Sequence, residues 1–345
     1  MHTPEYSIVI PVYNEQDSLP ELIGRLRSLM ERLDGTCEMI FVDDGSRDSS
    51  HALIAAICDE DPRFKMIRLS RNFGHQIAIS AGLDWAAGRA VVVMDADLQD
   101  PPELILEMAA RWRAGYEVVY AIREQRLGET AFKRTATHFF YRALQRITDL
   151  EIPVDVGDFR LVDRRALEAF KRLPESNRYV RGMFSWIGFR QTGVPYSRPG
   201  RFAGRTKYSF IKLLKLALDG IVGFSNAPLR IALKLGFLLS GLAFFAGVAA
   251  VVAKLTESYI VPGWASLVVA TTFLGGVQLI ILGVMGEYVA RIYDEVKRRP
   301  LYLVSGLHGF TSPPEVFTSP VSDAESQVTE ASLANLPGRS PGPPA

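Results

Sequence analysis

The chain has 345 residues, a formal net charge of +1 and 22% charged residues. This length allows one large core and an appended unit, because single domains usually run to about 100–200 residues. A charge so close to zero lacks the basic field of a general nucleic-acid-binding protein, so we expect no nucleic-acid partner. The two cysteines, Cys37 and Cys58, are too few for a disulfide scaffold, and we expect both to be buried small side chains.

Between residues 6 and 121, short segments rich in Val and Ile alternate with stretches of helical periodicity. The expected strands are Tyr6–Pro11, Glu38–Val42, Lys65–Leu69, Ala90–Met94 and Glu117–Ala121, and the helices between them include Leu19–Leu33 and Pro102–Ala114. Continuous apolar strands separated by helices predict an α/β fold in which a parallel sheet is covered on both faces.

Polar clusters follow four of these strands at the point where each strand ends. They are Tyr13–Glu15, Asp43–Asp44, Arg71–Gln76 and Asp95–Asp100. In open α/β sheets, ligands bind beyond the carboxyl ends of the strands. The sequence therefore predicts one ligand site at this edge of the sheet.

Beyond Gly223 the chain contains two long uncharged segments, Leu235–Ala253 and Trp264–Gly286. At about 1.5 Å per residue, each can cross a hydrocarbon core of about 30 Å. We interpret both as transmembrane helices rather than as a buried helical hairpin. Arg230 before the first segment and Lys297 after the second belong to the basic flanks, so the positive-inside rule predicts that both flanks are cytosolic.

The N-terminal residues MHTPEYSIVIPVYNE carry no basic segment ahead of their apolar run, unlike a secretory signal peptide. We therefore expect an integral protein of the inner or plasma membrane with its catalytic domain in the cytosol. The expected parts are a catalytic domain at 1–208, interfacial amphipathic helices at 209–230, two spans within 231–290, a cytosolic juxtamembrane segment at 291–310 and a disordered tail at 311–345. The amphipathic segment could equally pack on the catalytic domain.

The sequence DADLQDPPE, Asp95–Glu103, directly follows an apolar strand. Two carboxylates separated by one residue can hold a hard cation such as Mg²⁺ or Mn²⁺ that also bridges phosphates. Asp-x-Asp is frequent in turns as well, so the motif alone leaves a purely structural role open. We expect Asp100, which precedes two prolines, to cap the next helix.

Six motifs occur in one order along the chain. They are PVYNE (Pro11–Glu15), VDDGS (Val42–Ser46), RNFGHQ (Arg71–Gln76), DADLQDPPE, GDFRL (Gly157–Leu161) and RFAGRTKYS (Arg201–Ser209). With the two spans that follow, they resemble the polyprenyl-phosphate glycosyltransferases of the inverting family 2 type, relatives of dolichyl-phosphate mannose synthase and of bacterial undecaprenyl-phosphate glucosyltransferases. The resemblance implies a GT-A catalytic domain with a Rossmann-like parallel core, followed by a two-helix transmembrane hairpin.

The resemblance also assigns individual positions. It implies that the nucleotide-sugar donor is bound by Pro11, Tyr13, Glu15, Val42, Asp44, Asp95, Ala96, Asp97, Arg201 and Lys207. It implies that a metal ion is bound by Asp95, Asp97 and Gln99. Two of these positions keep other interpretations: Tyr13 could pack at the sheet edge, and the Arg201–Lys207 loop could contact lipid headgroups instead of closing over the diphosphate.

The acceptor, a lipid phosphate, needs a cationic pocket. Guanidinium groups match phosphate oxygens in pairs, so Arg123 is the strongest candidate, with Arg126, Lys133 and Arg134 beyond it. This basic run could instead meet anionic headgroups.

The catalytic positions implied by the resemblance are Asp158, Asp97 and Arg123. A phosphate monoester is largely ionised near neutral pH, so Asp158 could orient the acceptor rather than act as a base. We expect His75 to be a hydrogen-bonding element of its loop, and Arg178 and Arg181 to lie near the site.

The expected reaction is transfer of a hexose from a nucleotide-sugar, UDP-glucose first, to polyprenyl phosphate with inversion. GDP-mannose, UDP-N-acetylglucosamine, UDP-galactose and an aminoarabinose-type donor remain alternatives. A processive polysaccharide synthase is the rival enzyme, and a nucleotide-binding membrane scaffold is the rival that lacks enzyme activity. Glycines in the second span, such as Gly275 and Gly283, would also permit a homo-oligomer.

Overall fold

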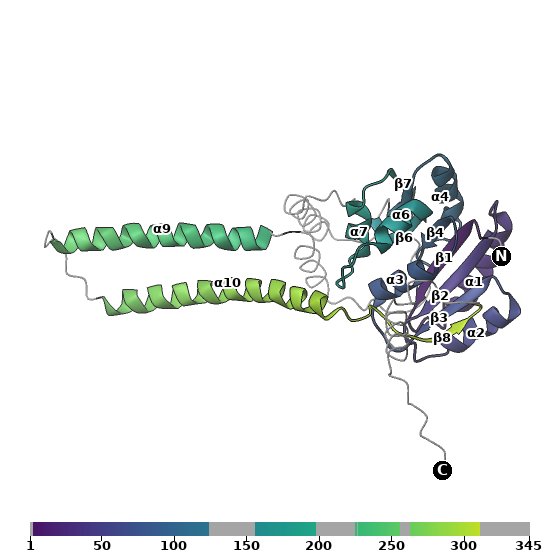
Figure 1. Cartoon of the computed structure of the whole chain (residues 1–345), viewed down its shortest axis with the longest axis horizontal. Coiled ribbons are helices and arrows are strands. Elements are labelled where there is room, and N and C mark those ends of the chain that lie inside the picture. Colours follow the sequence, from purple (N-terminus) through teal and green to yellow (C-terminus); the bar gives the residue numbers. More distant parts are fainter. Residues whose placement is uncertain (1–2, 124–155, 198–224, 226, 256–262, 311–345) are drawn as a thin grey trace, which may run out of the picture.

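The computed structural model describes residues 3–123, 156–197, 225, 227–255 and 263–310. They form an α/β domain and two long helices that project from one side of it, side by side (Figure 1). The α/β fold class and the two long apolar helices predicted from the sequence are thereby confirmed. Of the expected interfacial segment at 209–230, residues 209–224 and 226 lie outside the described residues, as does the expected tail at 311–345.

The described residues of the domain build an eight-stranded sheet in the order β7-β5-β6-β4-β1-β2-β3-β8. The strands are β1 (Tyr6–Val12), β2 (Cys37–Asp43), β3 (Phe64–Leu69), β4 (Ala90–Val93), β5 (Val118–Arg123), β6 (Val156–Asp163), β7 (Gln191–Tyr196) and β8 (Val304–His308). The five strands expected from the sequence are all present, with ends shifted by one or two residues.

The sheet is mixed rather than parallel throughout. Strands β4, β1, β2 and β3 pair in parallel, as expected. Strand β6, however, lies between β4 and β5 and is antiparallel to both, and β8 is antiparallel to β3. Neither strand was among the sequence expectations, because each pairs with a partner far away in the chain.

Helices cover both faces of the sheet. They are α1 (Leu19–Arg32), α2 (Ser50–Glu60), α3 (His75–Trp85), α4 (Leu104–Arg113), α6 (Arg164–Lys171) and α7 (Val180–Trp186). Alternate residues of β1 enter two separate cores: Ile8 packs with α1, α2 and α4, whereas Val9 packs with α3, α6 and α7. This three-layer arrangement buries the central strands on both faces and leaves their ends as the exposed edge.

Two local expectations are wrong. Helix α4 begins at Leu104, so Asp100 is not its cap; Asp100 is buried and accepts hydrogen bonds from the Asp95 backbone and the Tyr196 hydroxyl. Cys37 and Cys58 are half-buried rather than fully buried. Both expectations failed because the partners of Asp100 and the burial of the two cysteines depend on residues far away in the sequence.

The two long helices are α9 (Ala227–Leu255) and α10 (Trp264–Lys297), and both are long and apolar enough to cross a bilayer. Their large apolar side chains, such as Phe237 and Leu279, are exposed. Both extend beyond the uncharged segments: α9 starts within the segment expected to hold interfacial helices, and α10 continues into the expected juxtamembrane segment.

After α10 the chain returns to the domain. The helix ends at Lys297, and the C-cap residue Arg298 has a left-handed φ of 47°. The next residues form a segment that we call the return segment, residues 301–310, which includes β8. Its buried Tyr302 donates a hydrogen bond to Asp84 (3.1 Å), and Phe310 packs edge-on against Trp85 at 4.9 Å between ring centroids.

The packing of α3 on the sheet predicts the effect of one added methyl group. A Cβ at Gly82 would overlap the Val9 side chain and lie 3.0 Å from Val42 Cγ2, so Gly82→Ala should destabilise the domain by about 1–3 kcal/mol. Gly24→Ala is the control: it is also helical, with nothing near its added Cβ, and should stabilise by about 0.5–1 kcal/mol. Thermal unfolding of the purified chain measures both, and equal shifts would contradict this account of the packing.

Candidate active site

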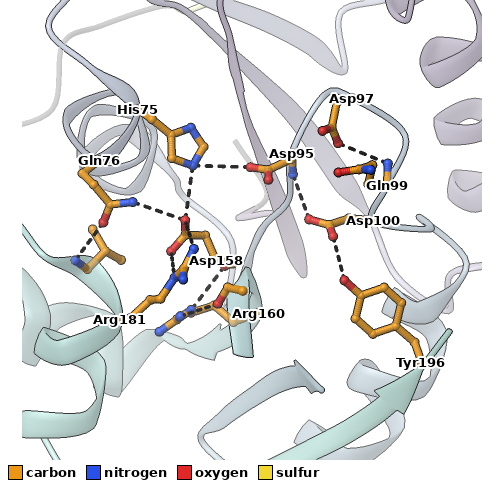
Figure 2. A network of polar contacts seen from close by, with 12 residues as sticks. His75, Gln76, Asp95, Asp97, Gln99, Asp100, Asp158, Arg160, Arg181 and Tyr196 are labelled. Atoms are coloured by element: carbon orange, nitrogen blue, oxygen red, sulfur yellow. Dashed lines mark hydrogen bonds and ion pairs between the residues drawn. The ribbon is translucent and has the colours of Figure 1, made fainter. Parts of the chain in front are cut away.

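The pairing of β6 with β4 determines which side chains meet at the sheet edge. In this antiparallel pair, Val93 lies opposite Arg160. Continuing the same register by two residues brings Asp95 opposite Asp158. Because β6 enters the sheet where the parallel strands leave it, its GDFRL motif lies beside the DADLQDPPE motif, and Figure 2 shows the two aspartates on neighbouring segments.

Four donor groups contact the buried Asp158 carboxylate. Arg181 donates from Nε to Oδ1 (2.8 Å) and from Nη2 to Oδ2 (3.0 Å), and Gln76 Nε2 donates to Oδ2 (3.2 Å). His75 Nε2 lies 3.3 Å from the same oxygen. Burial alone would raise the pKa of Asp158, but Arg181 and His75 hold that pKa well below its usual range. Asp158 is therefore a stable carboxylate.

His75 bridges two carboxylates rather than serving only its own loop. Its Nε2 lies 3.4 Å from Asp95 Oδ1 as well as 3.3 Å from Asp158 Oδ2 (Figure 2). The His75 side chain is 43% exposed, so loss of hydration opposes protonation of the ring only in part, and the two carboxylates raise the pKa of His75 to about 9. The RNFGHQ motif predicted that His75 lies in the loop beyond β3, and it does lie there, at the start of α3. The contact of His75 with two carboxylates could not be predicted from the motif, because Asp158 is brought close only by the fold.

The DADLQDPPE segment provides oxygen ligands at the end of β4. Burial raises the pKa of Asp95; the nearby Asp158 and Asp97 act in the same direction, and His75 opposes them. Asp95 Oδ1 is buried and accepts no hydrogen bond from the described residues. Asp97 Oδ1 accepts from the Gln99 backbone (3.1 Å). A divalent cation would relieve the repulsion among these carboxylates. The described residues contain no cluster of three or more His, Cys, Asp or Glu side chains placed to hold a metal ion, so Asp95 and Asp97 would fit such an ion only if ligands from outside the protein completed its shell.

Arg123 is joined to this segment through two intermediates. Its Nε lies 3.4 Å from the Tyr196 hydroxyl, which donates to Asp100 Oδ1 (3.0 Å), while Asp100 Oδ2 accepts from the Asp95 backbone (3.3 Å). The Arg123 guanidinium also lies against Gly157, where an added Cβ would be 2.8 Å from Nη2. The residue before Asp158 therefore lacks a side chain because Arg123 occupies that space.

The expected donor residues gather at the ends of β1 and β2. Pro11 lies opposite Val42 in the parallel register, and both are buried, while the Tyr13 side chain is 39% exposed. Asp44 accepts hydrogen bonds from the backbone of Phe73 (2.7 Å) and Gly74 (2.9 Å). Burial raises the pKa of Asp44, and these two hydrogen bonds oppose the rise.

Other expected residues have simple placements. The Glu15 carboxylate accepts from Ser18 Oγ (3.0 Å), and Ala96 is buried. Asp43 accepts from the Ser46 backbone (2.8 Å), which supports its structural role in the turn. The remaining candidates, Arg126, Lys133, Arg134, Arg201 and Lys207, lie outside the described residues.

A cavity of about 460 Å³ adjoins Asp44 on the side away from Asp95. It is lined by Gly45, Ser46, Arg47, Arg68, Leu69, Ser70, Arg71, Asn72 and Ser305. Three arginines make its wall cationic and suited to an anionic ligand. No local sequence pattern indicates this cavity, because its wall is completed by Ser305, which lies next to Arg68–Asn72 only through the return segment.

The Arg181–Asp158 pair predicts a stability difference between two arginine variants. Breaking a buried pair costs about 3–5 kcal/mol, and because 27% of the Arg181 side chain is exposed we expect about 1–3 kcal/mol for Arg181→Gln. Arg165→Gln breaks an ion pair with Glu117 whose arginine is 79% exposed, and it should cost less than about 1 kcal/mol. Thermal unfolding distinguishes the two, and a larger loss in the Arg165 variant would refute the assignment.

The family model described as Glycosyl transferase family 2 matches residues 7–170, a range that spans strands β1 to β6. A more distant similarity is to the crystal structure of glucosyl-3-phosphoglycerate synthase from Mycobacterium tuberculosis, at 18% identity over 64% of this chain and 78% of that one. Its TM-score of 0.44 is too low to support an inference.

Several relatives match nearly the whole chain. The Bacillus subtilis protein named uncharacterized glycosyltransferase YkcC is 52% identical over 88% of this chain and 94% of its own length. The Synechocystis protein named uncharacterized glycosyltransferase sll0501 is 49% identical over 89% and 96%. The SfII prophage-derived bactoprenol glucosyl transferase of Shigella flexneri is 40% identical over 88% and 98%. Identity at this level over most of both chains, together with the family model, shows that the chain belongs to glycosyltransferase family 2.

Proposed function

We propose that this chain transfers glucose from UDP-glucose to a polyprenyl phosphate with inversion at the anomeric carbon. The observation that carries the proposal is the meeting of the Asp95–Asp97 segment with Asp158 in one contact network (Figure 2). Arg123 is joined to this network through Tyr196 and Asp100. The relatives named bactoprenol glucosyl transferase support this acceptor and this sugar.

On the donor side, we assign the base and ribose to Pro11, Tyr13, Glu15, Val42 and Asp44. The exposed face of Tyr13 and the cationic cavity beside Asp44 support this assignment. We assign the diphosphate to Asp95, Ala96 and Asp97, with Arg201 and Lys207 added on the resemblance alone.

We propose that Asp95, Asp97 and Gln99 hold a divalent cation, Mg²⁺ or Mn²⁺. The buried Asp95 Oδ1 and its carboxylate neighbours support this choice. When bound, such an ion supplies positive charge beside the leaving diphosphate. The protein fixes the position of Asp95. His75 contacts its carboxylate, and Asp100, itself hydrogen-bonded to Tyr196, accepts a hydrogen bond from the Asp95 backbone.

On the acceptor side, we assign the lipid phosphate to Arg123, with Arg126, Lys133 and Arg134 as further candidates. An oxygen of that phosphate forms the new bond to the anomeric carbon while the bond to the nucleoside diphosphate breaks. The attacking phosphate has a second pKa of about 6, so little deprotonation is required. Asp158, with its low pKa and four donor groups, is suited to orienting groups near the anomeric centre rather than to accepting a proton.

In this proposal α9 and α10 cross the membrane and the catalytic domain lies on its cytosolic side. Their length and apolar composition support the spanning role, and the basic residues near their domain ends, such as Arg230 and Arg291, support the orientation. The lipid acceptor and the catalytic domain are then held at one surface, which favours their encounter.

The proposal predicts a product that partitions into organic solvent. Proteoliposomes containing the full chain should convert radiolabelled UDP-glucose into a lipid product only when both polyprenyl phosphate and a divalent cation are present. GDP-mannose, UDP-N-acetylglucosamine and UDP-galactose, tested in parallel, identify the donor. A water-soluble polymer would instead indicate a processive synthase, and nucleotide binding without any product would indicate a scaffold.

The same assay includes a pair of aspartate variants. Asp97→Ala should lower turnover by at least about 100-fold, because the loss of charge stabilisation is worth several kcal/mol. Asp17→Ala removes an exposed carboxylate near the end of β1 and should leave turnover unchanged. Full cation-dependent activity of the Asp97 variant would exclude it from the site.

The contact between Arg123 and Gly157 predicts a specific effect on the acceptor. Gly157→Ala should push the Arg123 guanidinium aside without unfolding the domain, because only the end of a flexible side chain must move. A lost charge-assisted hydrogen bond is worth about 1.5–3 kcal/mol, so the KM for polyprenyl phosphate should rise by about 10-fold or more. Arg123→Ala should act in the same direction. An increase confined to the KM for the nucleotide-sugar would show that Arg123 does not serve the acceptor.

A further inference from the structure

We propose that the return segment completes the nucleotide site, with Ser305 as a positioning residue in the wall of the donor cavity. This inference rests on the proposed function, since it treats the cavity beside Asp44 as part of the donor site. It adds that a segment on the far side of two long helices, about 230 residues later in the sequence, is needed to form that site.

The first support is an irregularity in the pairing of β8 with β3. Arg68 lies opposite Gly306, but its neighbour Leu69 lies opposite Val304, so Ser305 is an extra residue on β8. An extra residue of this kind is a β-bulge, and bulges near active sites commonly redirect a side chain. The Ser305 hydroxyl here donates toward the carbonyls of both Arg68 and Leu69 (3.2 Å each).

The second support is that the return segment holds the cationic rim of the cavity. Ser70 donates from its backbone to the Leu303 carbonyl (2.8 Å), so the three successive residues Arg68, Leu69 and Ser70 are attached to the return segment and lead into Arg71 and Asn72. This part of the chain carries two of the three cavity arginines, Arg68 and Arg71. Their placement therefore depends on β8 as well as on β3.

The third support is continuity with Asp44. The cavity begins at Gly45, the residue after Asp44, and its other wall ends at Asn72, the residue before Phe73. Asp44 itself accepts from the Phe73 backbone (2.7 Å). A nucleoside that contacts Asp44 thus adjoins the cavity, and the arginines give that cavity N–H donors for the oxygen atoms of a base or ribose.

The return segment is also firmly attached to the domain and to α10. Tyr302 is buried against Asp84, and Glu295 near the end of α10 accepts from the backbone and the hydroxyl of Ser176 (2.7 and 3.0 Å). Since contacts hold both the end of α10 and the return segment, Ser305 lies on a fixed support rather than on a free tail.

The test replaces Ser305 with a larger side chain that occupies part of the cavity. Ser305→Phe should raise the Kd for UDP and the KM for UDP-glucose by at least about 10-fold, while the KM for polyprenyl phosphate and the Tm stay unchanged. Leu307→Phe adds bulk two residues along the same strand but outside the cavity, and should leave all four quantities unchanged. Ser305→Thr keeps the hydroxyl and should retain most of the affinity for UDP.

Binding is measured on the full chain in detergent with UDP, uridine and inorganic diphosphate as separate probes. Weaker binding of UDP and uridine but not of inorganic diphosphate would place the nucleoside in the cavity and support the proposal. Weaker binding of diphosphate but not of uridine would contradict the assignment of the diphosphate to Asp95–Asp97 and would overturn the proposal. Unchanged UDP binding by Ser305→Phe would overturn it. If the unaltered chain bound no nucleotide, the proposed function itself would fail, which is a separate result.

Discussion

The antiparallel register between β4 and β6 is the constraint on which the candidate site depends. It places the Asp158 carboxylate beside Asp95 at the sheet edge, with Asp97 two residues further. Three acidic groups at one edge repel one another unless cations are added. Arg181 and His75 balance Asp158 from α7 and α3, and they also hold these two helices against the end of the sheet. The same contacts thus serve the packing of the domain and the electrostatics of the site.

This arrangement separates two kinds of carboxylate. Asp158 accepts from several donors and its pKa is held low. Asp95 has a raised pKa, and its buried Oδ1 accepts no hydrogen bond from the described residues and has the His75 ring, 3.4 Å away, as its ion-pair partner. The charge of Asp158 is already balanced by protein donors. An added cation would therefore stabilise the ionised form of Asp95 more than that of Asp158. The difference in environment, rather than the residue type, supports assigning them different roles.

The sequence predicted those parts of the molecule whose signals are local. The apolar strands β1 to β5 and the two long helices follow from composition and periodicity, and the DADLQDPPE segment was placed correctly at the end of β4. Asp158 was selected only by resemblance, because its proximity to Asp95 depends on β6, a strand that pairs across a long sequence separation. The same reason explains why the bridging position of His75 and the partners of Asp100 were not foreseen.

Strand β8 has a further consequence for how the domain can be isolated. Without the return segment, β3 would become an edge strand with unpaired backbone groups and a largely apolar sequence. Exposed edges of that kind template pairing between molecules and promote aggregation. A fragment cut ahead of α9 would therefore expose an unpaired edge, so the return segment belongs to the folding unit of the catalytic domain although it follows the two long helices.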